Sequence, residues 1–425
     1  MGGDSTMALV YFVNPQDWFL EKRGDRAPLG LGYLCSWTKK LGHQARIIDL
    51  NHVSQEDLLR DVLTEQPTHI CLSVSTPNYT QCIELAQKIR AMTSAVLIAG
   101  GNHVTDLPNE TPTLESFDYV IVGEGEQIMS DVFSGIAKLG INIGKSILDV
   151  DSIPMPDYDE LNMNRYTMSI NGKPGAIVIT SRGCKYNCAY CGSSKIKKWR
   201  GRSPQNVIEE MKVLYDKWGK RGFYFADDIF SADRQRTIEL CESIARQFNP
   251  KEITIRLTTR ADLLDEEILI AMKKCGVDII SLGCESGNDE ILRAIHKGMT
   301  VKQNKDCIEL CHKHDIKVKG FFIIGLPGET QETIKNTVQF VKDTKIDFAD
   351  FYPLTPYPGT QIWNKPERYG LEIDKPADND WNKYYQVGIG GASNVLFKHP
   401  NLSSEQILEA IRWAKEETKI PGMTS

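Results

Sequence analysis

Three cysteines within eight residues carry the clearest chemistry in this sequence. Cys184, Cys188 and Cys191 form a C-x3-C-x2-C run. Three thiolates so close together can bind three irons of a cubic [4Fe–4S] cluster, because soft sulfur ligands suit iron–sulfur clusters. The fourth iron then lacks a protein ligand, and an open coordination position lets a metal site act on a bound molecule. The alternative is a structural zinc site, which usually has a fourth Cys or His close by; here the next cysteine is Cys241, and no histidine lies between Cys191 and His296.

The cysteine spacing is typical of the radical SAM superfamily, and the sequence resembles that superfamily beyond the loop. The resemblance implies that the open iron binds the amino and carboxylate groups of S-adenosylmethionine (SAM). One electron then cleaves the sulfonium to give a 5′-deoxyadenosyl radical. The resemblance also implies a set of SAM-binding residues: Tyr190, Asp227, Asp228, Arg260, Glu285, Ser286 and Ile324. The residues alone leave open a core role for Tyr190, a helix N-cap for Asp228 and an ion pair with a nearby acid for Arg260.

Strand and helix patterns alternate from residue 175 onwards. Short apolar runs predict six strands, at 176–180, 223–227, 253–258, 279–283, 317–325 and 348–354. The six repeats resemble the partial (β/α)6 barrel of the radical SAM superfamily. The cysteine loop follows the first strand, and catalytic groups of such barrels lie at the carboxyl ends of the strands. The segment 352–360, after the sixth strand, is expected to face the substrate.

The first third of the chain shows a second alternating series. Strands are predicted at 9–13, 45–50, 69–74, 95–101 and 119–123, and helices at 29–41, 55–65 and 79–92. Such βαβ units predict a parallel α/β sheet of flavodoxin-like or Rossmann-like type. Ligands of these sheets bind beyond the carboxyl ends of the strands.

Three motifs in this region, at 28–34, 100–103 and 118–126, resemble the N-terminal cobalamin-binding domain of the B12-dependent (class B) radical SAM enzymes. The resemblance implies cobalamin contacts from strand-end residues: Ser73, Ser75, Thr76, Gly100, Gly101, His103, Gly123, Glu124 and Gly125. Taken singly, each glycine is also explained as a turn residue. The Asp-x-His-x-x-Gly signature that supplies a lower cobalt ligand in B12 mutases is absent, so no such ligand is assigned. Some relatives keep this fold without binding cobalamin.

The expected domain organisation follows from these two series. A cobalamin-binding-type domain is expected at 7–148, a linker at 149–173, the radical SAM barrel at 174–370 and a C-terminal region at 371–425. Prolines at every second position near residue 154 resist regular structure and suit an extended linker. The C-terminal region, with a capped helix at 403–417, is expected either to cap the barrel mouth and select the substrate or to close the barrel bottom as a packing helix.

Composition limits the possible partners and compartment. The 425 residues are 41% hydrophobic and 25% charged, which is ordinary for a globular protein. A net charge of −6 argues against nucleic acid as the main partner, since phosphate binding needs a basic face. Eleven cysteines, no signal peptide and no long apolar run predict a cytoplasmic protein without a membrane span. Cys307 and Cys311, with His312 and His314, form a conceivable second metal site, although cysteines at helical spacing are more often core thiols.

These features predict an enzyme, a B12-dependent radical SAM methyltransferase that acts on an unactivated carbon of a small-molecule or natural-product substrate. Its cofactors would be a [4Fe–4S] cluster, SAM and cobalamin, and its partner an electron donor such as flavodoxin or ferredoxin. The cofactors carry the chemistry, and the protein positions them. One alternative is an enzyme of the same architecture that catalyses cyclisation, deoxygenation, rearrangement or oxidation without methyl transfer, with or without cobalamin. The other is a non-catalytic corrinoid or iron–sulfur carrier or sensor.

Overall fold

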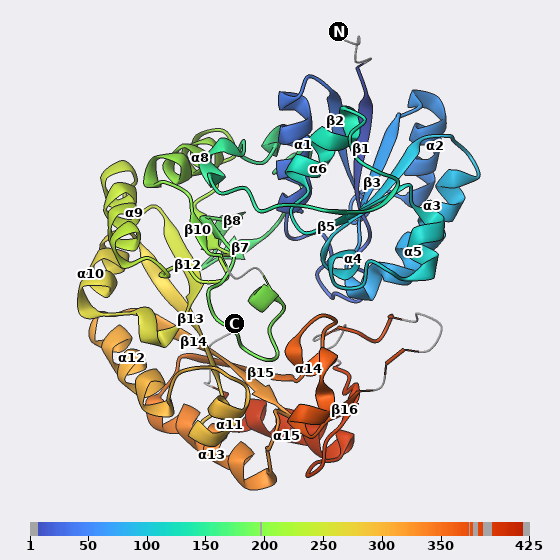
Figure 1. Ribbon diagram of the computed structural model, residues 1–425. Helices are drawn as coiled ribbons and strands as arrows, with labels where there is room; N and C mark the ends of the chain where they lie inside the picture. The colour runs from blue at the N-terminus through green and yellow to red at the C-terminus, as the bar shows by residue number, and fades with distance from the viewer. Residues whose placement is uncertain (1–6, 196–197, 374, 377–380, 386–392, 420–425) are drawn as a thin grey trace. The chain divides into compact units, whose positions relative to one another are not determined.

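The computed structural model describes residues 7–195, 198–373, 375–376, 381–385 and 393–419 (Figure 1). Its internal contacts divide the chain into two compact units. The first unit contains Met1–Thr167 together with Pro376–Gly390, and the second contains Met168–Lys375 together with Gly391–Ser425. The C-terminal region is therefore shared, because a short stretch of it packs with the first unit.

A six-stranded parallel sheet forms the core of the first unit. The strands are arranged in the order β2-β1-β3-β4-β5-β6. Their bounds are β1 Leu9–Asn14, β2 Gln44–Asp49, β3 His69–Ser73, β4 Val96–Gly100, β5 Tyr119–Val122 and β6 Gly140–Ile143. The central residues of β1, β3 and β4 are buried, as their uninterrupted apolar runs require when helices cover both faces of a sheet. The strand order reverses between β1 and β3, the kind of switch point beside which doubly wound sheets bind ligands.

Helices cover both faces of this first sheet. Figure 1 shows α1 and α6 on one face and α2, α3 and α5 on the other. The bounds are α1 Leu29–Lys40, α2 Gln55–Glu65, α3 Tyr79–Arg90, α4 Asn102–Asp106, α5 Thr111–Ser116, α6 Glu126–Phe133 and α7 Tyr158–Leu161. Local sequence sets the helix starts: the Ser54 hydroxyl accepts a hydrogen bond from the Asp57 backbone N–H at the start of α2, a standard N-cap.

A seven-stranded curled sheet forms the core of the second unit, in the order β15-β14-β13-β12-β11-β8-β7. All neighbouring strands are parallel except the hairpin of β7 with β8. The bounds are β7 Ser169–Ile170, β8 Lys173–Val178, β11 Gly222–Phe225, β12 Thr254–Thr259, β13 Val277–Glu285, β14 Lys317–Ile324 and β15 Phe348–Pro353. Two short pairs accompany it, β9 Ser181–Arg182 with β10 Arg200–Gly201 and β16 Glu372–Ile373 with β17 Phe397–Lys398.

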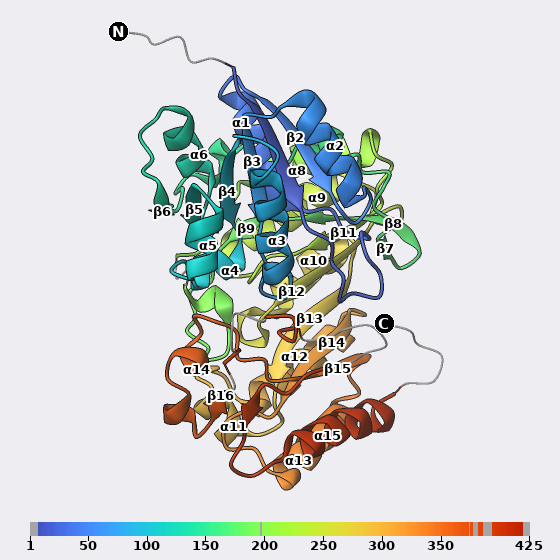
Figure 2. The same ribbon diagram turned by 90° about the vertical axis from the view of Figure 1, so that its right-hand side faces the viewer.

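Helices lie along the outer side of this half-barrel (Figure 1). They are α8 Pro204–Asp216, α9 Arg234–Gln247, α10 Glu266–Lys274, α12 Val301–Lys313, α13 Gln331–Thr344 and α15 Ser404–Glu417. Two further short helices are α11 Asp289–Ala294 and α14 Gln361–Asn364. Figure 2 shows α15 beside α13, and α15 also packs against β15. Ser403 caps α15 and forms a capping box with Gln406, which confirms the helix start expected from the sequence.

The predicted fold class is confirmed, and the differences are local. The structure adds β6, a short edge strand that the sequence pattern did not predict. The stretch 149–173, expected to be extended, instead contains a 3-10 turn at Val150–Ser152, α7 and the hairpin strand β7. Asp157 explains α7, because its carboxylate accepts the Glu160 backbone N–H at the helix start. In the described part of the chain, no helix has the length and apolar character needed to span a bilayer.

Candidate functional site

The cysteine loop lies at the carboxyl end of β8 and is fixed by backbone hydrogen bonds on both sides. Cys184 and Cys188 are buried, and Cys191 is half-buried. The Ala189 N–H donates to the Ile295 carbonyl at 2.9 Å, and the Ala189 carbonyl accepts the Ile362 N–H at 3.1 Å. The middle of the loop is thus held between the segments that follow α11 and begin α14.

The donor set of the loop fits an iron–sulfur cluster. Burial raises the pKa of Cys184 and Cys191, and the neighbouring cysteines raise it further. Thiols with a raised pKa become thiolates most readily beside a strong positive charge, which bound iron would supply. Among the described residues, no three His, Cys, Asp or Glu side chains converge on one ion position. In a cubic cluster each thiolate binds a different iron, so the three cysteines of such a site need not converge on one ion position.

The two adjacent acids after β11 have different environments. Asp227 is buried, and its carboxylate accepts hydrogen bonds from the hydroxyls of Thr180 at 3.0 Å and Ser181 at 2.6 Å. Asp228 is exposed and accepts a hydrogen bond from the Ser193 hydroxyl at 2.5 Å, just after the cysteine loop. The structure therefore leaves Asp228 open to a cation beside the loop, while Asp227 holds the strand that leads into the loop.

The predicted residue Arg260 forms an ion pair with Asp262. Its guanidinium donates to both carboxylate oxygens, at 2.9 and 3.0 Å, and stacks over the Tyr186 ring at 3.7 Å. Of the two alternatives for Arg260, the structure contains the ion pair with a neighbouring acid. Arg260 is 4% exposed and still lies near the loop, through Tyr186.

A buried triad joins the loop to the end of β13. Glu285 accepts a hydrogen bond from the Tyr190 hydroxyl at 2.7 Å and an ion pair from Lys297 at 2.8 Å, both at the same oxygen. Glu285 has a φ of +63°, a conformation uncommon for a residue with a side chain, and a register shift interrupts the strand between Gly283 and Glu285. Strained backbone of this kind clusters at functional sites.

The other two predicted SAM residues, Ser286 and Ile324, also lie at strand ends, and both are buried in the protein core. Ser286 is fully buried and hydrogen-bonded to the Thr337 hydroxyl of α13 at 3.3 Å, away from the loop residues. Ile324 is fully buried at the end of β14 and pairs in register with Pro353. The conceivable second site at Cys307 and Cys311 is a pair of buried thiols in α12, which is the core role expected of such spacing.

Sequence reasoning missed two buried charged residues of this unit, Lys297 and Glu329. Lys297 lies in the loop after α11 and is 4% exposed. Glu329 is fully buried in the turn after β14, where it accepts the backbone N–H groups of Gly325 and Leu326. The sequence contains a weak signal for Glu329, because an acid in a Gly-Leu-Pro-Gly turn can accept unpaired N–H groups; it contains none for Lys297.

In the first unit, the predicted cobalamin residues gather at the carboxyl edge of the sheet. Ser73 at the end of β3 pairs directly with Gly100 at the end of β4. A methyl group placed on Gly100 would meet nothing within 4 Å, and one on Gly123 would meet only the Gly144 carbonyl at 3.4 Å. Both positions therefore leave room for a ligand to approach the backbone. Gly101 and Gly123 both have a positive φ, +110° and +85°, but only at Gly101 would a Cβ collide with backbone, 2.7 Å from the Val74 carbonyl oxygen, so Gly101 is explained as a turn residue.

Polar groups without partners lie beside the same edge. The hydroxyls of Ser75 and Thr80 and the Asn78 amide oxygen are buried and have no hydrogen-bond partner among the described residues. Unsatisfied buried polar groups are costly, so a polar ligand that pairs with them is favoured. The amide- and phosphate-bearing periphery of cobalamin suits such an edge, and the residues present fit the cofactor.

His103 is not available as a cobalt ligand, because both of its ring nitrogens are engaged. One nitrogen contacts Glu110 at 2.7 Å and the other the Thr76 hydroxyl at 3.3 Å, and the His103 side chain is fully buried. Trp381, from the stretch of the C-terminal region that packs with this unit, donates to the same Glu110 at 3.0 Å and contacts the His103 ring edge-on. His103 and Thr76 are therefore structural supports of the edge.

The last two predicted cobalamin residues are also held by the protein. The Glu124 carboxylate accepts the Ile147 backbone N–H at 3.0 Å. Gly125 lies directly before α6, and a Cβ there would meet the Leu34 side chain at 3.2 Å. These residues shape the turn after β5, whereas Ser73, Gly100 and Gly123 are the open positions.

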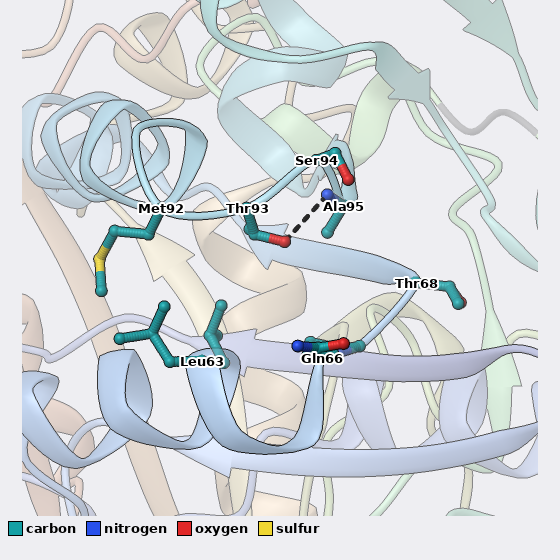
Figure 3. Close-up of a pocket in the computed structure, with 9 residues that line it drawn as sticks. Leu63, Gln66, Thr68, Met92, Thr93, Ser94 and Ala95 are labelled. Atoms are coloured by element: carbon teal, nitrogen blue, oxygen red, sulfur yellow. Dashed lines mark hydrogen bonds between the residues drawn. The ribbon is translucent and has the colours of Figure 1, made fainter.

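A separate cleft lies at the opposite, amino-terminal edge of the same sheet (Figure 3). It has a volume of about 510 Å³ and is lined by the last turns of α2 and by residues after α2 and α3, among them Leu63, Thr68 and Met92. The Thr93 hydroxyl accepts the Ala95 N–H there at 3.1 Å. None of its lining residues is an acid, base, cysteine or histidine, so this cleft lacks the groups that catalysis would need.

Two family models match this chain, one in each of its two units. Residues 20–133 match the B12 binding domain model, and residues 178–341 match the radical SAM superfamily model. The chain is 31% identical to an uncharacterized methyltransferase of Pyrococcus horikoshii, over 91% of this chain and 86% of that protein. It is 30% identical to the anaerobic magnesium-protoporphyrin IX monomethyl ester cyclase of Cereibacter sphaeroides, over 84% of this chain and 63% of that protein.

A solved structure has the same fold over nearly the whole chain. The radical SAM methyltransferase TsrM of Kitasatospora setae, with cobalamin and a [4Fe–4S] cluster bound, superposes with a TM-score of 0.76 at 17% identity. The match covers 99% of this chain and 92% of that one. The family expected from the cysteine loop and the strand-end motifs is thus confirmed: the chain belongs to the cobalamin-binding radical SAM enzymes.

Proposed function

We propose that this protein is a cobalamin-dependent radical SAM methyltransferase that acts on an unactivated carbon of a small molecule. One observation carries the proposal: a single chain combines a buried cysteine triad at a half-barrel strand end with a B12-type sheet whose carboxyl edge offers unpaired polar groups. Its relative at 31% identity and the solved structure of the same fold are both named methyltransferases. The cofactors of the enzyme are a [4Fe–4S] cluster, SAM and cobalamin.

When bound, the cluster supplies the electron for SAM cleavage, and cobalamin supplies the methyl group. The chain's own residues bind and orient these groups. The three cysteines of the loop hold iron, and Asp228 offers a carboxylate to the SAM ammonium. Glu285 is fixed by Tyr190 and Lys297 through one oxygen, which leaves its other oxygen for the hydroxyls of a ribose. Binding on the inner face of the half-barrel would also shield a reactive radical from water.

The concave face of the half-barrel supplies a polar wall for the substrate. Phe322 packs against Phe340 of α13, so this face of β14 lies under the helices. Lys319, three residues earlier on the strand, therefore points to the opposite, inner face. There it forms an ion pair with Asp350 at 2.7 Å, and the Tyr352 hydroxyl donates to the same carboxylate oxygen at 2.8 Å. A substrate with polar groups suits this wall better than a hydrocarbon.

We propose that the protein receives electrons from a one-electron donor of the flavodoxin or ferredoxin type. We also propose that it works in a reducing compartment such as the cytoplasm. All eleven cysteines are free thiols in the structure, which suits such a compartment. A second candidate function is cyclisation without methyl transfer. The relative that is named a cyclase, at 30% identity, favours keeping this alternative.

The proposal is tested without knowledge of the substrate. Anaerobically reconstituted protein receives hydroxocobalamin, a strong reductant and SAM labelled with ¹³C in its methyl group. We expect release of 5′-deoxyadenosine and transfer of the label to the corrinoid, both measured by mass spectrometry. The matched control is the triple variant with Cys184→Ala, Cys188→Ala and Cys191→Ala, which should release no 5′-deoxyadenosine. Release of 5′-deoxyadenosine with no label on the corrinoid would favour the alternative function, and no release at all would contradict both.

A further inference from the structure

Lys297 is a buried cation beside the cysteine loop that the proposed reaction does not by itself require. A lysine buried to 4% exposure loses most of its hydration, which costs several kcal/mol of folding free energy unless its charge is well compensated. Its partner, Glu285, is buried to 6%. A hydrophobic pair of similar volume would stabilise the fold as well or better. The presence of this ion pair therefore calls for a role other than stability.

The backbone around Glu285 and Lys297 leaves room for both charged side chains. A Cβ on Gly283 would lie 2.5 Å from a Glu285 carboxylate oxygen and 2.8 Å from the Lys297 ammonium, so only glycine leaves room for both groups. The positive φ of Glu285 and the register shift beside it turn the carboxylate toward Lys297. The Tyr190 hydroxyl completes the contact, at 2.7 Å from Glu285 and 3.4 Å from Lys297. The three side chains form one fixed electrostatic unit.

This unit lies against the loop that holds the cluster. Tyr190 itself stands between Cys188 and Cys191 in the sequence. The Ala189 N–H, next to Cys188, donates to the Ile295 carbonyl two residues before Lys297. Although burial lowers the pKa of Lys297, the charges of Glu285 and Cys188 raise it above the usual value.

We propose that Lys297 is a positioning residue that sets the reduction potential of the cluster, with Glu285 as its opposing counter-charge. The inference rests on the proposed function, because it assumes the cluster on the three cysteines. Reduction adds one electron, taken from the external donor, and makes the cluster more negative by one charge; no bond to the protein forms or breaks. A fixed buried cation stabilises the reduced state, and a fixed anion destabilises it, because charge interactions are strong where water is excluded.

The electrostatic role makes a prediction that a purely structural role does not. Lys297→Met removes the positive charge and should lower the potential, whereas Glu285→Gln removes the negative charge and should raise it. The double variant should return close to the wild type, because both charges are gone. Lys297→Arg retains the charge and should leave the potential close to wild type. A structural defect would instead shift the two single variants in the same direction.

The test is a redox titration of the cluster, followed by EPR, on anaerobically reconstituted protein without SAM, so that no cofactor contact of Glu285 enters. Each single variant is expected to change the equilibrium constant for reduction at least tenfold, in opposite directions, which is about 59 mV for a one-electron couple. The matched control is Lys342→Met, which breaks the exposed ion pair with Glu417 and should leave the potential unchanged.

Iron and sulfide content, measured before each titration, distinguishes a failure of the proposed function from a failure of the proposed role of Lys297. Wild-type protein that takes up no cluster would overturn the proposed function itself. Wild-type protein with a normal cluster, and single variants whose potentials are equal or shift with the same sign, would overturn the role of Lys297. If Lys297→Met fails to retain a cluster, Glu285→Gln still decides the question, because only the electrostatic account requires its potential to rise.

Discussion

Glu329 is expected to make the stability of the second unit depend on pH, in a direction opposite to that of an ordinary carboxylate. The side chain is fully buried in the turn after β14. One carboxyl oxygen accepts the Gly325 N–H at 2.6 Å and the Leu326 N–H at 3.1 Å, and the other has no hydrogen-bond partner among the described residues. Burial raises the pKa of Glu329 to about 8, although the two backbone hydrogen bonds oppose the shift.

The sign and size of the effect follow from linkage. The folded-state pKa of Glu329, about 8, lies above the usual value of 4.5, so the folded protein binds this proton more tightly than the unfolded chain does. The stabilisation is fully present below pH 4.5 and is lost as pH rises through 8. The difference between the two pKa values corresponds to a maximum on the order of 4 to 5 kcal/mol, at ~1.36 kcal/mol per pH unit. Most of the loss falls between about pH 5 and 8.

The perturbation that isolates this effect is Glu329→Gln, which keeps the shape and both backbone hydrogen bonds but cannot ionise. We expect the unfolding midpoint in urea to be similar for the variant and the wild type at pH 5. At pH 9 the variant should be the more stable of the two. The matched control is Glu332→Gln, at an exposed position in the first turn of α13, which should leave the pH dependence of the wild type intact. Parallel pH profiles for Glu329→Gln and the wild type would refute the argument.

Three further substitutions test other parts of the site. Gly283→Ala is expected to displace the Glu285 ion pair and to cost about 1–3 kcal/mol of unfolding free energy with partial loss of iron; normal stability and iron content would contradict the close approach of these groups. Asp227→Asn leaves a buried hydroxyl without its charged acceptor, so the thermal midpoint should fall by an amount equivalent to about 1–3 kcal/mol, and an unchanged midpoint would show that Asp227 does not hold the strand before the loop. Trp381→Phe replaces the indole with a smaller aromatic ring and removes the hydrogen bond to Glu110; we expect a loss of at least about 1 kcal/mol of unfolding free energy in chemical denaturation, and no loss would argue against this contact within the first unit.

The strands and the position of the cysteine loop could be predicted from the sequence. Buried parallel strands consist of uninterrupted apolar runs, and β1, β3 and β14 each contain one. Once the strands are located, the residues after them are placed at the carboxyl edges by topology alone. This is why Ser73, Gly100 and Glu285 could be named as strand-end residues from the sequence.

The missing elements depend on contacts that leave no local pattern. The edge strand β6 is short, and its Ile143 is 72% exposed, so it shows neither a buried run nor a regular alternation. Lys297 follows Glu285 by twelve residues, and an intervening helix separates them. Their contact depends on the register shift at Gly283, which a sequence pattern does not reveal. Trp381 lies in the stretch Pro376–Gly390, which packs with the first unit although the chain before and after it belongs to the second, and local propensity cannot encode such a long-range contact.

The distribution of buried charge in the second unit links these observations. Lys297 with Glu285 and Arg260 with Asp262 both contain a deeply buried cation; burial lowers the pKa of each cation, but the charges of its acid partner and of Cys188 raise it. Buried ion pairs contribute little to stability, because the loss of hydration offsets the attraction between the charges. Two such pairs beside one sulfur ligand are therefore better explained by the charge that the cluster gains on reduction than by the needs of the fold. If so, Asp262→Asn should raise the cluster potential, as is expected of Glu285→Gln. A lower potential in Asp262→Asn would show that the two ion pairs do not act on the cluster in the same way.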